Sequence, residues 1–341
     1  MVILNIPIEP LEERYSTQWD KWFKAAFETS GLDVVHVYGQ ETSGKINSGS
    51  FLDVIETNQY KTSQLQMILK FLSGYDKEEK IVLFFHDLWF PGLETIAYIR
   101  EGLGLKYLKI CGCLHAGSYD EFDFLNKKGM TPWAEHMEMG WLNGIVDKIF
   151  VATEFHKRLL IKTRMWKNPN KIEVTGFPFY TDFINPEFTR EYTNREKIIV
   201  FPHRLDAEKN PQMFNKLKAD LEDEFSDWNF CMTKKFCDTK DRYYQILQKA
   251  YISVSFADQE TWGIAMQESV ICGCLPLVPN RLSYSEMYLP IFKYDCECDL
   301  VDRIRMLILH YPDLSMNQQH YTIMKKGKDA IPNMIKIIRE L

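Results

Sequence analysis

Short, unbroken apolar runs recur along the chain and alternate with stretches in which apolar residues return every three or four positions. The runs are IVLFF (81–85), LKICGCL (108–114), KIFVAT (148–153), EKIIVFP (196–202), YISVSF (251–256) and CLPLVP (274–279). Continuous apolar runs are typical of parallel strands that are covered on both faces. Each run is therefore predicted to be a buried strand.

The stretches between these runs predict helices. Ser16 or Thr17 could cap the first helix, which would end at Gly31. Its shared apolar face comprises Trp19, Trp22, Phe23, Ala26 and Phe27. Further helices are predicted at 133–145, 154–165, 210–220, 241–250 and 260–272, and at the end of the chain. Regular alternation of strand and helix predicts a doubly wound α/β fold.

The chain has 341 residues, which is more than one ordinary domain holds, so two Rossmann-like domains are expected. The stretch from 176 to 197 contains two prolines and no clean period, and a new strand follows it. The predicted domains are accordingly 1–185 and 186–320. Residues 321–341 are expected to form a C-terminal helix that packs back on the N-terminal domain.

Composition and charge exclude only a few classes of function. The net charge of −6 does not support binding to nucleic acid through overall charge. No run approaches the roughly 20 apolar residues of a membrane span, and no basic leader is present, so a cytoplasmic protein without membrane contacts is expected. The eight cysteines include three C-x-C pairs and are expected to be reduced, mostly buried thiols rather than zinc ligands.

The segment 257–286 carries the strongest chemical signal. Glu260 and Glu268 are separated by seven residues, and Gly263 marks a turn between a strand and a helix. Backbone N–H groups at 262–265 would then form a helix N-terminus that suits a diphosphate. Glu260 could accept hydrogen bonds from sugar hydroxyls, and Glu268, two turns along, could reach a ribose. The alternative is a capped amphipathic helix with two solvated glutamates.

A second signal lies at 198–214, where Arg204 and Lys209 follow a predicted strand. Loops beyond the carboxyl ends of parallel strands are where ligands bind in open α/β sheets. Two cations there would neutralise a nucleoside diphosphate leaving group. The alternative is a charged loop in which Arg204 and Lys209 form local ion pairs with Asp206 and Glu208.

Two histidines, His86 and His115, follow predicted strands in the first half. A histidine at such a position could bind a sugar or an acceptor, or could transfer a proton. Asp87 and Asp120 could orient these rings or bind acceptor hydroxyls. The alternative for each histidine is a structural, hydrogen-bonded role.

These segments, in this order, resemble retaining glycosyltransferases of family 4, which have the GT-B architecture of two Rossmann-like domains facing each other across a cleft. The resemblance covers 145 to 290. Its pieces are ATEFHKRL (152–159), KIEVTGFP (171–178), FPHR (201–204), EKNP (208–211), Y-x2-L-x2-A (244–250), ETWG (260–263) and QES (267–269).

The resemblance implies roles for particular residues. Glu260 would contact the donor sugar and Glu268 the ribose, while Arg204 and Lys209 would hold the diphosphate. The donor-binding positions also include Thr261, Trp262, Gly263 and Ile264. The cleft histidine of the family matches His115. The family's glycine-rich loop after the first strand is replaced here by NIPIEPLEERYSTQW (5–19), in which Arg14 and Tyr15 are the acceptor-side candidates.

The tract GCLPLVPNRLSYSEM (273–287), with FPHR, is similar to the subgroup of tRNA-queuosine mannosyltransferases and small bacteriophage-type DNA-base glycosyltransferases. This implies transfer from a nucleoside diphosphate sugar, with UDP favoured, to a modified base such as 5-hydroxymethylcytosine in phage DNA, within the host cytoplasm. DNA is favoured over tRNA as the acceptor. No cofactor and no metal are expected.

Other functions remain open on the sequence alone. One alternative is a tRNA-queuosine-type mannosyltransferase that uses GDP-mannose, and others are a GT-B nucleotide-sugar epimerase, a phosphorylase and a non-catalytic binding protein. A dehydrogenase is disfavoured because no G-x-G-x-x-G follows a strand. Two groups of cations could contact a nucleic acid: Lys157, Arg158, Lys162, Arg164, Lys167 and Lys171, and Lys234, Lys235, Lys240 and Arg242.

Overall fold

The computed structural model describes residues 1–12, 14–44, 53–76, 78–185, 187, 191, 194–310 and 313–341, without the side chains of 313 and 314. Contacts divide the chain into two units. The first unit comprises Met1–Pro178 with Asp329–Leu341, and the second comprises Phe179–Lys328. The expected boundary between 185 and 186 falls on Pro186, which lies outside the described residues, so it stays a prediction.

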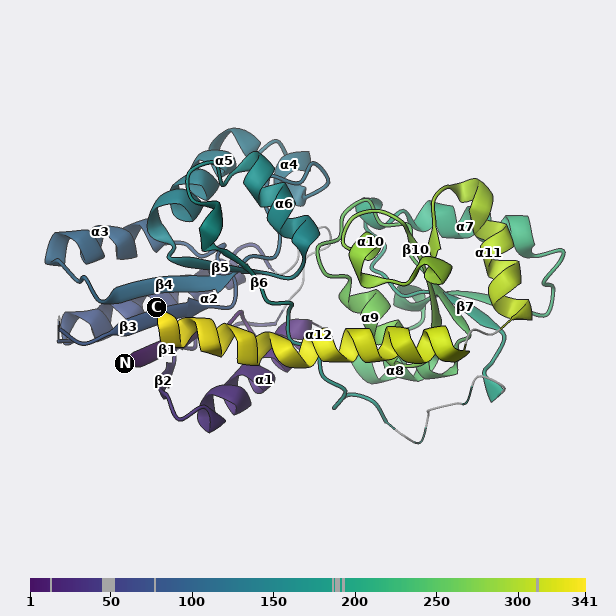
Figure 1. The fold of residues 1–341 in the computed structure, drawn as a ribbon, viewed down its shortest axis with the longest axis horizontal. Coiled ribbons are helices and arrows are strands. Elements are labelled where there is room, and N and C mark those ends of the chain that lie inside the picture. The colour runs from purple at the N-terminus through teal and green to yellow at the C-terminus, as the bar shows by residue number, and fades with distance from the viewer. Residues whose placement is uncertain are drawn as a thin grey trace. The chain divides into compact units, whose positions relative to one another are not determined.

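The first unit is built on a six-stranded sheet in the order β2-β1-β3-β4-β5-β6. Its strands are β1 (Val2–Ile6), β2 (Asp33–His36), β3 (Ile81–Phe85), β4 (Leu108–Cys113), β5 (Lys148–Val151) and β6 (Ile172–Val174). Its helices are α1 (Tyr15–Thr29), α2 (Glu56–Ser73), α3 (Leu93–Leu103), α4 (Phe124–Lys127), α5 (Thr131–Gly140), a π-helix (Trp141–Ile145) and α6 (Glu154–Thr163). Figure 1 shows α5 and α6 on one side of this sheet and α1 on the other.

The unbroken apolar strands β1, β3, β4 and β5 are buried on both faces, whereas the edge strand β2 is partly exposed. Successive residues of a strand point to opposite faces. Leu83 accordingly joins one large apolar cluster, and the next residue, Phe84, packs on the opposite face. There the Phe84 ring lies 5.2 Å from the ring of Phe23 and 5.7 Å from that of Phe27, both on α1. The predicted apolar face of the first helix is thus its contact with the sheet.

The second unit has a five-stranded sheet in the order β11-β10-β9-β7-β8. Its strands are β7 (Ile198–Phe201), β8 (Asn229–Met232), β9 (Ile252–Val254), β10 (Leu275–Pro279) and β11 (Lys293–Tyr294). Its helices are α7 (Pro211–Leu221), α8 (Lys240–Lys249), α9 (Ile264–Ile271), α10 (Tyr284–Met287), α11 (Glu297–Leu309) and α12 (Asp313–Glu340). The α12 residues up to Lys328 belong to this unit, and those from Asp329 belong to the first.

The expected α/β class with two parallel sheets is confirmed. Each of the six predicted strands is present, and every pairing between the described strands is parallel. The predicted cap of the first helix is wrong. α1 begins at Tyr15 after Arg14, and the hydroxyl of Ser16 accepts a hydrogen bond from the N–H of Leu11 instead, at 3.2 Å.

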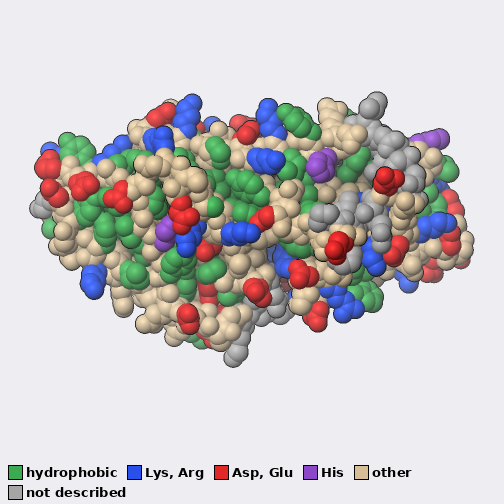
Figure 2. Space-filling view, turned by 90° about the horizontal axis from the view of Figure 1, so that it is seen from below, with side chains coloured by type: hydrophobic (Ala, Val, Ile, Leu, Met, Phe, Trp, Pro, Cys, Tyr) green, Lys and Arg blue, Asp and Glu red, His purple; other side chains and the backbone are tan. Residues whose placement is uncertain are grey.

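The thiol prediction holds for the six free cysteines, of which Cys111, Cys113, Cys272 and Cys274 are buried. It is wrong for Cys296 and Cys298, which form a disulfide with each other. Among the described residues, no helix is both long enough and apolar enough to span a bilayer. On the face seen in Figure 2, acidic and basic side chains are interspersed.

Candidate functional site

The residues of the predicted donor site lie on loops that leave the same edge of the second sheet. β7 and β9 are neighbours in this sheet, and β10 lies beside β9. Lys209 belongs to a 3-10 turn, Ala207–Lys209, that follows β7, and Glu260 lies in the loop between β9 and α9. Since parallel strands end at one edge, the fold alone brings these loops together.

Lys209 and Glu260 form a buried ion pair. The Nζ atom of Lys209 lies 3.2 Å from Oε2 of Glu260 and donates a hydrogen bond of 2.5 Å to the carbonyl of Gln259. The two side chains are 10% and 16% exposed. Burial by itself would raise the pKa of the Glu260 carboxyl, but Lys209, His203 and the N–H of Gly263 outweigh it and lower that pKa. Glu260 is therefore a fixed negative charge beside a fixed positive one.

The other oxygen of Glu260 caps α9. Its Oε1 accepts hydrogen bonds from the N–H groups of Gly263 at 2.8 Å and Trp262 at 3.4 Å. The predicted helix at 260–272 therefore begins four residues late, at Ile264, because Gly263 adopts a left-handed φ of 76°. Two of the four amides expected to bind a diphosphate are occupied by this carboxylate.

Glu268 lies on α9 and is enclosed by α8. Its Oε1 accepts hydrogen bonds from Lys240 Nζ at 2.9 Å and from the Tyr244 hydroxyl at 2.8 Å, and its Oε2 accepts one from the Tyr243 hydroxyl at 3.0 Å. Glu268 is only 3% exposed. The solvated-glutamate alternative is therefore wrong for this residue. Sequence reasoning missed the three donors, although Tyr244 opens the Y-x2-L-x2-A segment and Lys240 and Tyr243 lie just before it.

Arg204 forms the local ion pairs that the sequence left open as an alternative. Its Nε lies 2.8 Å from Oδ2 of Asp206, and its NH2 group contacts Glu208. Lys209 does not join this set, because it pairs with Glu260. A phosphate at Arg204 would have to replace or share these carboxylate partners. Of the remaining donor-binding candidates, Thr261 and Ile264 are partly exposed and Trp262 is buried.

In the first unit, the structure brings together two residues that the sequence named separately. The Tyr15 hydroxyl lies 3.0 Å from Nδ1 of His115, and Nε2 of His115 lies 2.7 Å from the carbonyl of His86. A carbonyl only accepts, so Nε2 carries the proton and Nδ1 accepts from Tyr15. Burial lowers the pKa of His115, which keeps the ring neutral. Both ring nitrogens are engaged in this arrangement.

His86 is a core residue. Its Nε2 donates to Oδ1 of Asn5 at 2.8 Å, and its ring lies 4.3 Å from that of Phe23. It is 1% exposed, and burial lowers its pKa to about 3. The structural alternative therefore describes His86, and the expected contact with an acceptor would need this side chain to leave the core.

The other acceptor-side candidates have mainly local partners. Asp87 accepts from the N–H of Trp89 at 3.1 Å and pairs with Lys61 at 3.0 Å. Asp120 is 7% exposed and accepts from the N–H of Phe122 at 3.0 Å, which is a turn contact within its own loop. Arg14 stands at the N-terminus of α1, beside Tyr15. These positions stay predictions.

The loop after β1, which lacks the expected glycines, is held by a side chain. The Nε2 atom of Gln64 on α2 donates to the carbonyls of Pro7 at 2.9 Å and Val37 at 2.8 Å. Glu9 is buried in the same loop and accepts from the Thr57 hydroxyl at 2.6 Å. In this loop, hydrogen bonds from fixed side chains take the place of the close backbone approach that glycine residues would allow.

Only some of the lysines and arginines in the two proposed basic groups are exposed on the surface. Arg164 is buried and bonded to Glu138 at 2.8 Å, and Lys171 donates to the carbonyl of Val146 at 2.7 Å. Lys240 belongs to the Glu268 cluster. The residues that remain exposed are Arg158, Lys162 and Lys167 in the first group and Lys234, Lys235 and Arg242 in the second.

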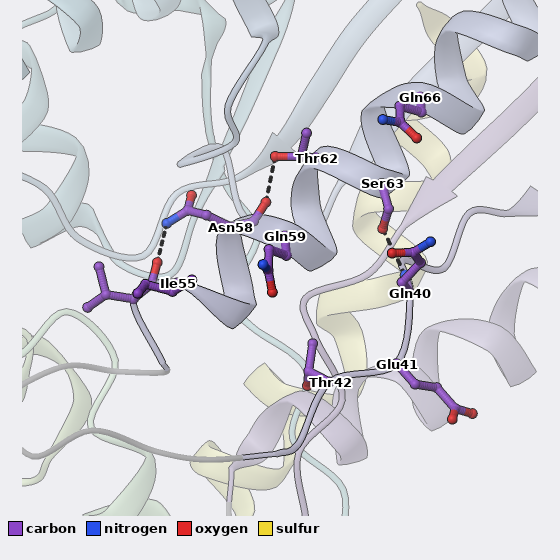
Figure 3. A pocket seen from close by; sticks show the side chains of 10 residues that line it. Gln40, Glu41, Thr42, Ile55, Asn58, Gln59, Thr62, Ser63 and Gln66 are labelled. Carbon is purple, nitrogen blue, oxygen red and sulfur yellow. Dashed lines mark hydrogen bonds between the residues drawn. The ribbon is translucent and has the colours of Figure 1, made fainter.

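A pocket of about 720 Å³ lies in the first unit between residues 40–42 and the N-terminal half of α2 (Figure 3). Amides and hydroxyls dominate its lining, among them Gln40, Asn58, Gln59 and Ser63. None of the predicted site residues lines it.

Comparison with known proteins supports the fold more than the substrate. No family model matches the chain. A tRNA-queuosine alpha-mannosyltransferase of Drosophila melanogaster is 24% identical over 135 residues, which are 33% of this chain and 36% of the relative. The chain thus spans about a third of the length of this curated relative.

Solved structures match nearly the whole chain at low identity. A sucrose-phosphate synthase from Thermosynechococcus elongatus matches with a TM-score of 0.66 and 9% identity over 100% of this chain and 98% of its own. An alpha,alpha-trehalose-phosphate synthase from Burkholderia vietnamiensis gives a TM-score of 0.66 and 11% identity over the same shares. An Anabaena protein in complex with UDP and glucose gives 0.58 and 10%, again over 100% and 98%. The chain therefore has the two-sheet α/β fold of GT-B glycosyltransferase structures.

Proposed function

We propose that the chain is a retaining glycosyltransferase. It takes a sugar from a nucleoside diphosphate sugar, with a UDP-sugar favoured, and transfers it to a hydroxyl. The observation that carries this proposal is the buried Lys209–Glu260 pair at adjacent strand ends, with Glu268 held two turns along α9. The fold supports the same conclusion, since a sucrose-phosphate synthase, a trehalose-phosphate synthase and a protein in complex with UDP and glucose share it.

Each group in the second unit has a proposed task. Glu260 accepts hydrogen bonds from sugar hydroxyls, for which its fixed negative charge suits it. Glu268 and its three donors bind the ribose. Lys209 and Arg204 stabilise the negative charge that develops on the diphosphate as it leaves, which preorganised cations can do without a metal. The amides at the start of α9 that Glu260 leaves open add to this.

The transfer step conserves atoms and charge. The bond between the anomeric carbon and the diphosphate oxygen breaks, and the acceptor oxygen bonds to the same face of the sugar. The departing diphosphate takes the proton of the acceptor hydroxyl. The configuration at the anomeric carbon is therefore retained.

The favoured acceptor is a modified base such as 5-hydroxymethylcytosine in DNA, contacted by the exposed lysines and arginines of the two basic groups. A second candidate is mannosyl transfer from GDP-mannose to queuosine in tRNA. The match to a tRNA-queuosine alpha-mannosyltransferase favours it.

The test is to incubate the protein with UDP-glucose or GDP-mannose and with hydroxymethylated DNA or tRNA. Mass spectrometry should find one hexosyl group added to a nucleoside of one polymer, and NMR of that product should find the anomeric configuration of the donor. Incubation with the donor alone separates the rivals, since an epimerase would convert it and a phosphorylase would require phosphate. Failure of transfer to every acceptor, together with epimer formation, would overturn the proposal.

A further inference from the structure

Three residues with a contact or an electrostatic link to Glu260 each carry a buried polar atom that has no hydrogen-bond partner within the described part of the chain. These atoms are Nε2 of His203, the hydroxyl of Ser283 and the hydroxyl of Tyr288. The three residues are 4%, 0% and 4% exposed. A buried polar group without a partner destabilises the fold, so three such atoms on residues linked to Glu260 call for a missing partner.

The three residues come from two loops that meet at Glu260. His203 lies two residues after the end of β7, and its ring interacts electrostatically with both Glu260 and Lys209. Ser283 directly precedes α10, and its N–H bonds to the carbonyl of Glu260 at 3.4 Å. Tyr288 directly follows α10, and burial and the negative charge of Glu260 both raise the pKa of its hydroxyl. Each of the three residues is thus linked to Glu260, the residue that the proposed function assigns to the sugar.

The chemistry of the three atoms suits a neutral, hydroxyl-rich ligand. Burial lowers the pKa of His203 to about 3, so its ring is neutral and offers one donor and one acceptor nitrogen. The hydroxyls of Ser283 and Tyr288 can each donate and accept. A sugar hydroxyl needs both kinds of partner, whereas a phosphate needs donors and positive charge. The charged ends of Lys209 and Glu260 are already paired with each other.

We propose that His203, Ser283 and Tyr288 form the polar wall that recognises the hydroxyls of the donor sugar beside Glu260. This inference rests on the proposed function, because it supplies the sugar end of the same donor site. His203 is the specificity-determining residue of the wall, because its buried Nε2 has no partner among the described residues and its ring interacts electrostatically with both members of the Lys209–Glu260 pair.

The first test compares a nucleotide sugar with its free nucleotide by calorimetry. UDP-glucose with UDP, and GDP-mannose with GDP, are titrated into the wild type and into His203→Phe, and the pair that the wild type binds is used. His203→Phe should weaken binding of the nucleotide sugar roughly three- to tenfold, the loss of one hydrogen bond, and should leave binding of the free nucleotide unchanged. A donor that lacks the recognised hydroxyl should bind both proteins equally.

The second test uses variants that remove an unpartnered hydroxyl. Ser283→Ala and Tyr288→Phe should keep or raise the melting temperature of the free protein, because each deletes a buried group without a partner. Both should weaken binding of the nucleotide sugar relative to the nucleotide. Ser253→Ala is the matched control, since the Ser253 hydroxyl on β9 is likewise buried and without a partner. It should share the effect on stability and leave sugar binding intact.

The outcomes distinguish a failure of this inference from a failure of the proposed glycosyltransferase function on which it rests. If the wild type binds neither nucleotide nor nucleotide sugar, the proposed donor site is wrong, and the proposed sugar-recognition role of His203, Ser283 and Tyr288 is wrong as well. If the wild type binds both, but His203→Phe, Ser283→Ala and Tyr288→Phe all keep the wild-type ratio of the two affinities, the wall is wrong and the donor site stands. Should His203→Phe fail to fold, the two hydroxyl variants decide the question alone.

Discussion

At the scale of single residues, the Lys209–Glu260 pair organises the site. Breaking a buried ion pair leaves an uncompensated charge, which is far more costly than removing an exposed one. Lys209 lowers the pKa of Glu260 against the effect of burial, so the carboxylate depends on the lysine for its charge. The two residues are 51 positions apart in the sequence and act as one unit.

Replacement of Lys209 by Met should slow turnover by about 10²–10³-fold, because a preorganised cation no longer faces the leaving diphosphate. The rate of donor consumption under saturating donor measures this effect. Lys216→Met is the matched control, since Lys216 is exposed and pairs with Glu297 on the surface of the same unit. Equal turnover in both variants would show that Lys209 does not contribute to catalysis.

Some residues of the site could be predicted from the sequence and others could not, for physical reasons. Strand ends can be read from apolar runs, so Lys209 and Glu260 could be placed on neighbouring loops before the structure was seen. Lys240, Tyr243 and Tyr244 could not be placed around Glu268, because that contact depends on how α8 packs against α9. His203 stood in the recognised FPHR segment, but only its burial beside Glu260 gives it meaning.

At the scale of elements, the start of α9 is fixed by Gly263. Its φ of 76° suits glycine, and a Cβ there would come within 2.9 Å of the Tyr284 ring. The same position lets Oε1 of Glu260 reach the Gly263 N–H. The sequence predicted a longer helix because it cannot reveal that a carboxylate, rather than a further helical turn, satisfies these amides.

Gly263→Ala should therefore lower stability by more than the roughly 1–2 kcal/mol that left-handed backbone alone costs a side chain. Gly129→Ala supplies the comparison, because Gly129 has a φ of 71° and, its chain neighbours apart, no atom of the described residues lies within 4 Å of an added Cβ. Urea unfolding of the two variants measures the difference, which reports the clash with Tyr284. If both substitutions cost the same, Tyr284 does not constrain the turn.

At the scale of the whole molecule, two sheets of one class were predictable because strand periodicity and parallel pairing follow from local apolar patterns. The C-terminal helix was expected at 321–341, packed on the N-terminal domain. α12 begins earlier, at Asp313, and its residues from Asp329 onward group with the N-terminal unit, where Arg339 donates to the carbonyl of Ser30. The early start of α12, whose residues up to Lys328 group with the second unit, was not predicted.

Buried neutral histidines in both units make the fold sensitive to acid. Burial lowers the pKa values of His86, His156 and His203 to about 3, whereas the unfolded chain titrates near 6.5. Between these values the unfolded state binds more protons, so stability is present above about pH 6.5 and falls as the pH decreases. Each histidine contributes up to about 1.4 kcal/mol per pH unit.

Urea midpoints measured between neutral and mildly acidic pH should therefore fall with pH, and less steeply in His156→Gln, which loses one such group. His310→Gln is the control, because His310 is exposed, and it should follow the wild-type curve. Parallel curves for His156→Gln and the wild type would show that the buried ring does not set this dependence.

The central claim, that the second unit binds a nucleoside diphosphate sugar through Glu260 and Glu268, is tested most directly by calorimetric titration of UDP-glucose and GDP-mannose in the presence of EDTA. The wild type should bind one of the two, and Glu268→Gln, which removes the charge and one acceptor that face the ribose, should bind it about tenfold more weakly. Binding of neither donor, or equal binding by Glu268→Gln and the wild type, would contradict the claim.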